Sequence, residues 1–371
     1  MVFDIYVNSH DVKSISLGNA IQKKAKVWGK ARVDYTAANE YAESHYGLKN
    51  YFQVGDNGTG IVNEDIFNAR DGVMMRRNDC GDSDDIWIDT PKLSHFGFEL
   101  LQGFEPPMNQ NDWNNPSQVS EKYVRYLRHS VIPKLFDSTG IESIVFYNAN
   151  LRGEGLPFST RNGELGLVKT APVAATVHID FDVGACTNAT ELVNLLLSER
   201  IIVPEDCNEF GDEGRRRIIQ LIESGHRFVL LNFWNSLTSR PTSRAPLGVL
   251  ATDYDQECCS FPEAKPSDHS RWYCYPQLGV NECLVFKQYD RSLSFSSDVW
   301  HTGLSDIGHH TNDPPRRNFD VRAFIVLNER IDKSIDRFGE KRRKSFMNMH
   351  ESECFCENQA DSRANGKLLD K

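Results

Sequence analysis

The sequence lacks a hydrophobic run long enough to cross a membrane, and it lacks an excess of basic residues. No apolar stretch approaches the roughly 20 residues that a transmembrane helix needs. Acidic residues outnumber basic residues by 52 to 42, so the formal net charge is −10. This balance argues against nucleic-acid binding, which usually needs a basic face. The N-terminus, MVFDIYVNSH, has no basic region followed by an apolar run, so we expect no secretory signal and a cytoplasmic location.

Cysteine is also scarce, and its count is odd. Nine cysteines in 371 residues do not form a disulfide framework of the kind found in small secreted domains. We therefore expect reduced thiols. The sequence also contains no HExxH motif, the pattern in which two histidines on one helix hold zinc in many metallohydrolases.

What the sequence does have is enough apolar material for a large core. Hydrophobic residues make up 39% of the chain and aromatic residues 11%, which excludes disorder of the whole chain. The length exceeds that of one typical domain but does not require two. No internal repeat is present.

The distribution of turn residues and apolar periodicity predicts a chain with helices first and many strands afterwards. Residues 1–90 are rich in turn residues, clustered at 54–60 and 80–85, and are expected to be irregular. Apolar residues at helical spacing predict helices at 118–138, 187–197 and 211–224. Short apolar runs predict strands at 143–149, 174–183, 226–237, 271–278, 281–290 and 318–328.

This order of elements predicts a mainly β protein with flanking helices, not a doubly wound parallel sheet. Helices and strands do not alternate strictly, so a β-barrel or sandwich core with helices packed outside it is favoured. We expect an N-terminal irregular or mixed region at 1–94 that packs on the core, a β-domain with helical support at 95–330, and a charged, partly disordered tail at 331–371.

The triplet His178-Ile179-Asp180 is the most informative motif. On a strand, residues i and i+2 point to the same face, so the imidazole and the carboxylate project side by side. A second histidine would complete the two-histidine, one-carboxylate set that holds Fe(II) with three coordination positions open. Taken alone the triplet is common, and a hydrogen-bonded pair at a strand end is the alternative.

The second histidine is expected in the strand-rich half. The candidates are His226, His269, His301, His309 and His310. His301, in DVWHTGLSD, precedes a strand that carries several arginines. Alternation along that strand predicts that Arg316, Asn318, Asp320 and Arg322 share one face, whereas Arg317 points the other way. A planar guanidinium there could bind the far carboxylate of 2-oxoglutarate while the keto-acid end chelates iron.

Several blocks, in order, resemble the hydroxylase/desaturase family of Fe(II)/2-oxoglutarate enzymes. This family includes the bacterial cephamycin 7α-methoxylation component and fungal gibberellin desaturase-type enzymes. The blocks are HFGFELL, YVRYLRHSVIPKLF, SIVFYNANLR, VHIDFD, LNFWNSL with PLGVLATD, RWYCYPQLGVNECLVFKQYD, WHTGLSD and RRNFDVR. Together they span about residues 95–328.

The resemblance implies a double-stranded β-helix, or jelly-roll, and a specific set of site residues. It implies Fe(II) held by His178, Asp180 and His301, and 2-oxoglutarate held by Arg316 or, as second choice, Arg322. Dioxygen would be the oxidant, with ascorbate as the reductant in assays. Decarboxylation of 2-oxoglutarate to succinate would accompany hydroxylation, desaturation or oxidative cyclisation of a substrate.

The sequence also departs from the family's pattern near the expected substrate. The family often has Arg-Pro after the tryptophan of its Asn-x-Trp strand, whereas this chain reads Asn235-Ser236. We predict substrate contacts from Asn232, Trp234, Arg240, Arg244, Lys287 and Tyr289. The basic residues among them suit a small anionic substrate, such as the prenylated glutamate that kainoid synthases cyclise. A terpenoid or peptide-derived metabolite is an equal alternative.

Two other function classes compete with this hypothesis. One is a jelly-roll binding or partner protein of a biosynthetic pathway that has lost turnover. The other is a zinc hydrolase, which needs three ligands and a general base and leaves the arginine-bearing strand unexplained. The expected partner in the favoured hypothesis is a small-molecule substrate, with no nucleic acid or membrane, and the oligomeric state is open.

Overall fold

The structure is a computed structural model. It describes residues 27–40, 60–79, 82–88, 90–108, 116–136, 140–154, 159–163, 166–181, 183, 186–198, 211–238, 244–251, 271–292, 299–304, 307, 313–332, 336 and 338. In this part of the chain no helix is both long and apolar enough to cross a membrane.

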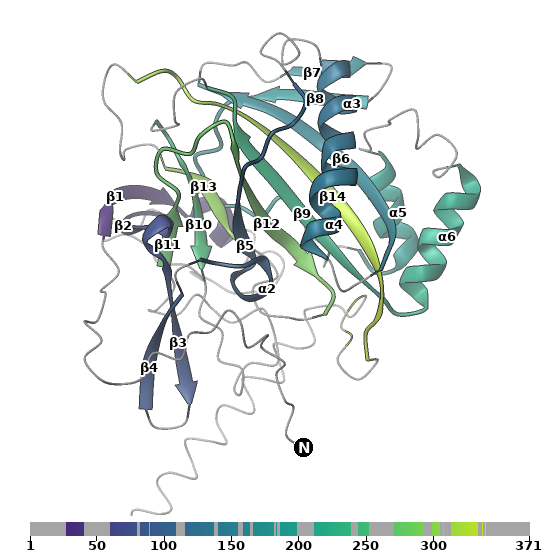
Figure 1. Cartoon of the computed structure of the whole chain (residues 1–371), viewed down its shortest axis with the longest axis horizontal. Helices are drawn as coiled ribbons and strands as arrows, with labels where there is room; N and C mark the ends of the chain where they lie inside the picture. The colour runs from purple at the N-terminus through teal and green to yellow at the C-terminus, as the bar shows by residue number, and fades with distance from the viewer. Residues whose placement is uncertain are drawn as a thin grey trace, which may run out of the picture.

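Two β-sheets dominate the molecule (Figure 1). The larger sheet has seven strands in the order β5-β12-β9-β14-β6-β8-β7, and the smaller has five in the order β1-β2-β11-β10-β13. The large-sheet strands are β5 (Phe98–Gln102), β6 (Ile141–Gly153), β7 (Ser159–Gly163), β8 (Gly166–Ala171), β9 (His226–Ser236), β12 (Glu282–Asp290) and β14 (Arg317–Arg330). The small-sheet strands are β1 (Val27–Asp34), β2 (Ile61–Asn68), β10 (Leu247–Ala251), β11 (Arg271–Cys274) and β13 (His301–Gly303).

The strand connections define a jelly-roll. In chain order, β6, β9, β12 and β14 belong to the large sheet, whereas β10, β11 and β13 belong to the small sheet. The backbone at His178 adds an antiparallel bridge to β13. The chain therefore crosses between two four-stranded layers in the manner of a double Greek key. The predicted mainly β class, with a double-stranded β-helix core and flanking helices, is confirmed.

The N-terminal region differs from the irregular structure expected for residues 1–90. β1 and β2 pair with each other, and β2 pairs in parallel with β11, so they widen the small sheet. β3 (Val73–Asp79) and β4 (Asp82–Ile88) form a separate antiparallel hairpin that projects from the body in Figure 1. The expectation of irregular structure at 80–85 was wrong for Asp82, Asp84 and Asp85, which belong to β4 although aspartate is typical of turns.

Helices pack against both faces of the large sheet. On the outer face, α3 (Pro116–Tyr126) and the turns that follow it pack against Val229, Leu231 and Phe233 of β9. On the inner face, α5 (Ala189–Ser198) and α6 (Asp212–Glu223) pack against Phe228 and Leu230. Because alternate residues of a strand face opposite sides, the next inner-face residues of β9 are Asn232 and Trp234.

The helix predicted at 118–138 is interrupted at its middle. α3 passes into a π-helical turn, Leu127–Val131, and then into a short helix, α4 (Ile132–Leu135). Pro133 lies in the first turn of α4. Proline has no backbone N–H to give to the preceding turn, so the helical hydrogen-bond ladder is broken before it. A further short helix, α2 (Leu93–Phe96), is a single turn before β5.

Candidate metal centre

The backbone bridge between His178 and His301 builds the centre. The segment 174–183 is not the continuous strand predicted, since it makes isolated bridges at Thr176 and His178 only. The N–H of His178 donates to the carbonyl of His301 and the N–H of His301 donates to the carbonyl of His178, both at 3.1 Å. This pair of hydrogen bonds brings the imidazole rings to a centroid distance of 4.3 Å.

Asp180 completes the cluster, two residues beyond the bridge. Its Oδ1 lies 3.6 Å from Nε2 of His178, and its Oδ2 lies 3.3 Å from Nε2 of His301. One potential ligand atom from each of the three residues lies within 4.8 Å of the others. The structure therefore brings together the three side chains of the predicted facial set, from segments 120 residues apart in the sequence.

The histidine rings are oriented for metal binding. Nδ1 of His178 lies 2.8 Å from the carbonyl of Thr176, and Nδ1 of His301 lies 3.2 Å from the carbonyl of Val299. A carbonyl only accepts, so each Nδ1 carries the proton and each Nε2 of a neutral ring presents a lone pair. Two lone pairs and a carboxylate then converge, which is the donor set of a bound cation.

Asp180 is held as an anion. Burial by itself would raise the pKa of this carboxyl, but the Arg322 guanidinium and the two histidines hold it well below its usual range. Arg322 donates to Oδ1 at 2.5 Å, and Nδ2 of Asn232 donates to Oδ2 at 2.7 Å. The Asp180 N–H donates to Oε1 of Gln288 at 2.8 Å. Two strands of the large sheet, β14 and β9, therefore hold the carboxylate, and a third, β12, holds the backbone of Asp180.

His301 is favoured in its neutral form. Burial lowers the pKa of its imidazole, the nearby Asp180 carboxylate opposes this shift, and His178 adds to it. The His301 side chain is only 5% exposed, whereas that of His178 is 26% exposed. The cluster is thus shielded from solvent at His301 of β13 and more accessible to solvent at His178.

Arg316 lies next to β14 and faces the same cavity as His178, Asp180 and His301. Its Nε donates to Oδ1 of Asn318 at 2.9 Å, an NH group donates to the carbonyl of Ala245, and its guanidinium lies 5.1 Å from the ring centre of Trp234. Burial, helped by the neighbouring charge of Arg152, lowers its pKa to about 9. An arginine this well buried is a strong site for a carboxylate of a bound molecule.

The strand face predicted from alternation is observed. Arg316 and Asp320 line the cavity, Asn318 bonds Arg316, and Arg322 reaches Asp180. Phe319 and Val321 point to the opposite, outer face of the sheet. Arg322, the second choice for 2-oxoglutarate, therefore contacts the predicted ligand carboxylate itself.

The predicted substrate residues separate into two groups. Asn232 and Trp234 lie on the inner face of β9 and line the cavity. Arg244 instead pairs with Glu154 at 2.6 Å and also donates to a backbone carbonyl. Arg240, with the alternative ligands His269, His309 and His310, lies outside the described residues. The remaining histidine candidate, His226, bonds the Leu221 carbonyl far along β9 from the cluster.

Lys287 and Tyr289 do not line the cavity, and β12 carries a bulge between them. The pairing with β9 shifts between Lys287 and Tyr289, so these residues point to opposite faces of the sheet. Lys287 is buried against Asp290, with Nζ 2.8 Å from Oδ2. The Tyr289 ring stacks on Phe228, under the α5 and α6 helices.

Sequence reasoning missed several residues that support the centre. Gln288, the residue at the bulge, holds the backbone of Asp180. Arg152 from β6 lines the cavity and pairs with Asp320 at 3.2 Å. Gln288 and Arg152 are polar residues within strands that contain many apolar residues. Because a buried polar side chain needs a partner, their place in the sequence could have indicated a role at the centre.

The fold and the cluster thus define a jelly-roll protein with a His-Asp-His cluster between its sheets. A family model described as an oxidoreductase/YMDC permease-like domain matches residues 81–326. The chain belongs to this family. The family's description agrees with the predicted oxidoreductase class. No protein with a curated function matches the sequence.

Solved structures with a similar course of the chain carry descriptions of iron-dependent enzymes. One is the iron and alpha-ketoglutarate-dependent endoperoxidase NvfI, with 18% identity over 82% of this chain and 99% of that chain, and a TM-score of 0.49. Another is the non-heme alpha-ketoglutarate-dependent epimerase SnoN, with 12% identity over 62% of this chain and 79% of that chain, and a TM-score of 0.31.

Proposed function

We propose that this protein oxidises a small metabolite with Fe(II), 2-oxoglutarate and dioxygen. One observation carries the proposal: the His178-Asp180-His301 cluster and the buried Arg316 guanidinium face one cavity between the two sheets. Two imidazoles and one carboxylate leave three coordination positions for other ligands, which is the arrangement of non-haem iron oxygenases. When bound, iron would supply oxidation by dioxygen coupled to the decarboxylation of 2-oxoglutarate.

The protein's own residues would bind and orient the cosubstrate. We assign Arg316 to the far carboxylate of 2-oxoglutarate, because its guanidinium is buried, planar and directed into the cavity. The indole Nε1 of Trp234 is buried and has no hydrogen-bond partner among the described residues. A bound acceptor would relieve the cost of this unpartnered donor. Arg322 would hold Asp180 in its ligating orientation.

The finer substrate class is also part of the proposal. We propose hydroxylation, desaturation or oxidative cyclisation of a small metabolite, with anionic prenylated amino acids of the kainoid type as the first to screen. Among the described residues, Arg152 is the second guanidinium that lines the cavity, and its side chain is 19% exposed. Asp320 contacts only its Nε, at 3.2 Å, so we expect an anionic substrate to bind through the terminal NH groups of Arg152.

The experiment is an anaerobic titration of Fe(II) and then 2-oxoglutarate into the metal-free protein. A bidentate keto acid on Fe(II) at an open facial site should give a weak absorption band near roughly 500–530 nm. We expect the band with the unaltered chain and with His129→Ala, an exposed histidine of the π-helical turn. We expect no band with His301→Ala.

Two outcomes would contradict the proposal. Failure of the unaltered protein to bind iron would favour a jelly-roll binding protein without turnover. Iron binding with no keto-acid band, together with hydrolytic activity on addition of zinc, would favour the zinc hydrolase. A band in His301→Ala as strong as in the unaltered chain would remove this residue from the ligand set.

A further inference from the structure

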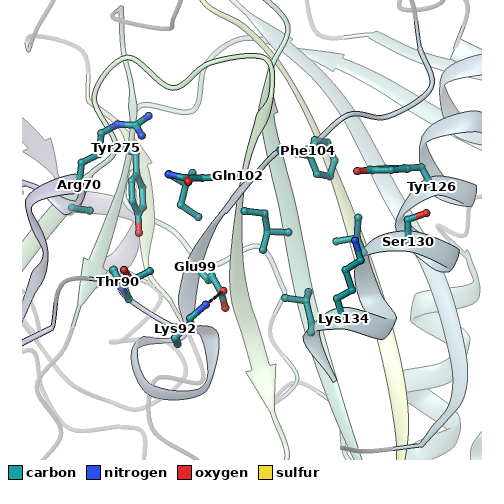
Figure 2. A pocket seen from close by; sticks show the side chains of 17 residues that line it. Arg70, Thr90, Lys92, Glu99, Gln102, Phe104, Tyr126, Ser130, Lys134 and Tyr275 are labelled. Atoms are coloured by element: carbon teal, nitrogen blue, oxygen red, sulfur yellow. Dashed lines mark hydrogen bonds and ion pairs between the residues drawn. The ribbon is translucent and has the colours of Figure 1, made fainter. Parts of the chain in front are cut away.

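A second cavity lies outside the jelly-roll interior, and none of its lining residues lines the metal cavity. Its volume is about 450 Å³. This is within the range of cavities that hold small organic ligands. Figure 2 shows that its lining extends around the edge strand β5, with Tyr275 and Thr90 on one side and Ser130 and Lys134 of the helical segment on the other. None of the residues proposed to bind iron or 2-oxoglutarate lines this cavity.

The floor of this outer cavity is apolar. On the helical side of β5 it is formed by Leu101 with Val131 and Leu135, and on the opposite side by Leu100, next to Tyr275. Phe104 closes one end, where its ring packs edge-on against Tyr126 at a centroid distance of 5.3 Å. Such a surface suits the hydrocarbon or aromatic body of a ligand, because the body leaves water when it binds.

The rim of the outer cavity carries more cations than carboxylates. Arg70 is neutralised by a two-pronged contact with Glu282, at 2.7 and 2.6 Å, and Lys92 is neutralised by Glu99 at 2.7 Å. Lys134 has no acidic partner among the described residues. In a chain of net charge −10, an unneutralised lysine at a cavity mouth is a specific place for an anion.

The hydroxyl of Tyr275 supplies an independent observation. Tyr275 is 4% exposed, and its hydroxyl has no hydrogen-bond partner among the described residues. In Figure 2 this hydroxyl points into the cavity, toward Thr90 and Lys92. A buried hydroxyl without a partner costs free energy, and a polar group of a bound ligand would recover it.

We propose that the outer cavity is a binding site for a small amphiphilic anion. The apolar body of the ligand lies over Leu101 and Leu135, its anionic group meets Lys134, and a polar group that extends around the edge of β5 past Leu100 meets the Tyr275 hydroxyl. The site is independent of the proposed function, because it uses no residue of the metal cavity.

The test uses two fluorescent probes that share one aromatic body. 1-Anilinonaphthalene-8-sulfonate carries a negative charge, and N-phenyl-1-naphthylamine lacks it. We expect both probes to bind the full chain saturably, with one molecule per protein. The change Lys134→Gln should weaken the anionic probe about threefold to fivefold, the size of a partly exposed ion pair, and leave the neutral probe unchanged.

Two further variants locate the site. Lys30→Gln makes the same charge change on β1, where Lys30 is 74% exposed and does not line the cavity, and should alter neither probe. Ser130→Phe places a ring in the cavity and should weaken both probes about tenfold or more. Circular dichroism and the iron–keto-acid band check that each variant is folded.

The proposal is overturned by any of three results. These are the absence of saturable binding to the unaltered chain, an equal effect of Lys134→Gln and Lys30→Gln on the anionic probe, and unchanged binding of both probes to folded Ser130→Phe. Failure of the proposed function would be seen separately. In that case the iron–keto-acid band would be missing while probe binding and its sensitivity to Lys134→Gln remained.

Discussion

Two buried carboxylates, Asp180 and Asp290, differ in what surrounds them. Asp290 is fully buried and accepts from Nε and from one terminal NH group of Arg227, at 3.0 and 2.7 Å. Lys287 adds a contact of 2.8 Å, and Ser292 donates through its backbone and its hydroxyl. Every direction around this carboxylate is thus filled by a donor of the protein.

Asp180 is buried to a similar degree, but its neighbours are arranged differently. Arg322 and Asn232 fill part of its acceptor capacity, and the rest faces the Nε2 atoms of two histidines at the wall of a cavity. A closed shell of donors indicates a structural ion pair. A carboxylate that shares a cavity with neutral ligand atoms indicates a cation site. Burial alone therefore does not distinguish the two roles, whereas the chemistry of the neighbours does.

The largest expected effect follows from removing the charge at each carboxylate. We expect Asp180→Asn to lower Fe(II) affinity by about 100-fold or more, because a charged ligand becomes a neutral amide. We expect Asp290→Asn to leave affinity per folded molecule unchanged. Anaerobic metal titration measures both. Equal losses of affinity in the two variants would contradict the assignment of Asp180 to a cation site and of Asp290 to a structural ion pair.

The second prediction concerns stability. Asp290→Ala leaves the buried Lys287 and Arg227 cations without their shared partner, so we expect a loss of about 3–5 kcal/mol in the free energy of unfolding. Urea denaturation of the metal-free protein measures it. A matched Glu329→Ala change removes only the more exposed partner of Arg227 and should cost less than about 1 kcal/mol. A cost for Asp290→Ala as small as that of Glu329→Ala would contradict the assignment.

Acid should weaken the Asp290 cluster in a defined direction. Burial raises the pKa of Asp290, but Lys287 and Arg227 outweigh this and hold it below its ordinary value. A lowered pKa in the folded state contributes stability above the unfolded pKa of about 3.9, and this contribution is lost as the pH falls below that value. The urea denaturation midpoint should therefore fall more between pH 6 and pH 3 for the unaltered chain than for Asp290→Asn. An equal fall would show that this carboxylate titrates normally.

A smaller effect is expected from the arginines. Arg316→Gln should raise the dissociation constant of 2-oxoglutarate about tenfold to 100-fold, the value of one or two hydrogen bonds to a charged group. Arg152→Gln, a matched change in the same cavity, should alter it less, because Arg152 is paired with Asp320. The iron–keto-acid band gives both constants. No change in Arg316→Gln would transfer the carboxylate role to Arg322.

Much of the fold followed from local patterns. The helices predicted at 187–197 and 211–224 are observed at 189–198 and 212–223, and the strand predicted at 226–237 is observed at 226–236. These segments combine clear periodicity with capping or turn residues at their ends. The N-terminal strands were missed, because β1 and β2 depend on pairing with distant partners such as β11, which no local pattern contains.

The site was predictable where chemistry and spacing coincided. The His-x-Asp triplet and the arginine on an alternating strand face both indicated residues that reach one cavity. The wrong expectation was a continuous strand at 174–183, since only isolated bridges form there. The separation of Lys287 from Tyr289 could not be foreseen, because the bulge at Gln288 reverses the alternation of β12.

The smallest expected effects come from two buried tyrosine hydroxyls, one with a partner and one without. The hydroxyl of Tyr123 donates to Oδ1 of Asn235 at 2.7 Å in the outer core, whereas that of Tyr275 meets no described partner. Tyr123→Phe strands a buried acceptor and should lower the free energy of unfolding by about 1–2 kcal/mol. Tyr275→Phe removes only an unpartnered hydroxyl, so its effect should lie within about 0.5 kcal/mol of zero. Urea denaturation of both variants tests this, and a loss at Tyr275 as large as that at Tyr123 would show that its hydroxyl is already satisfied in the ligand-free protein.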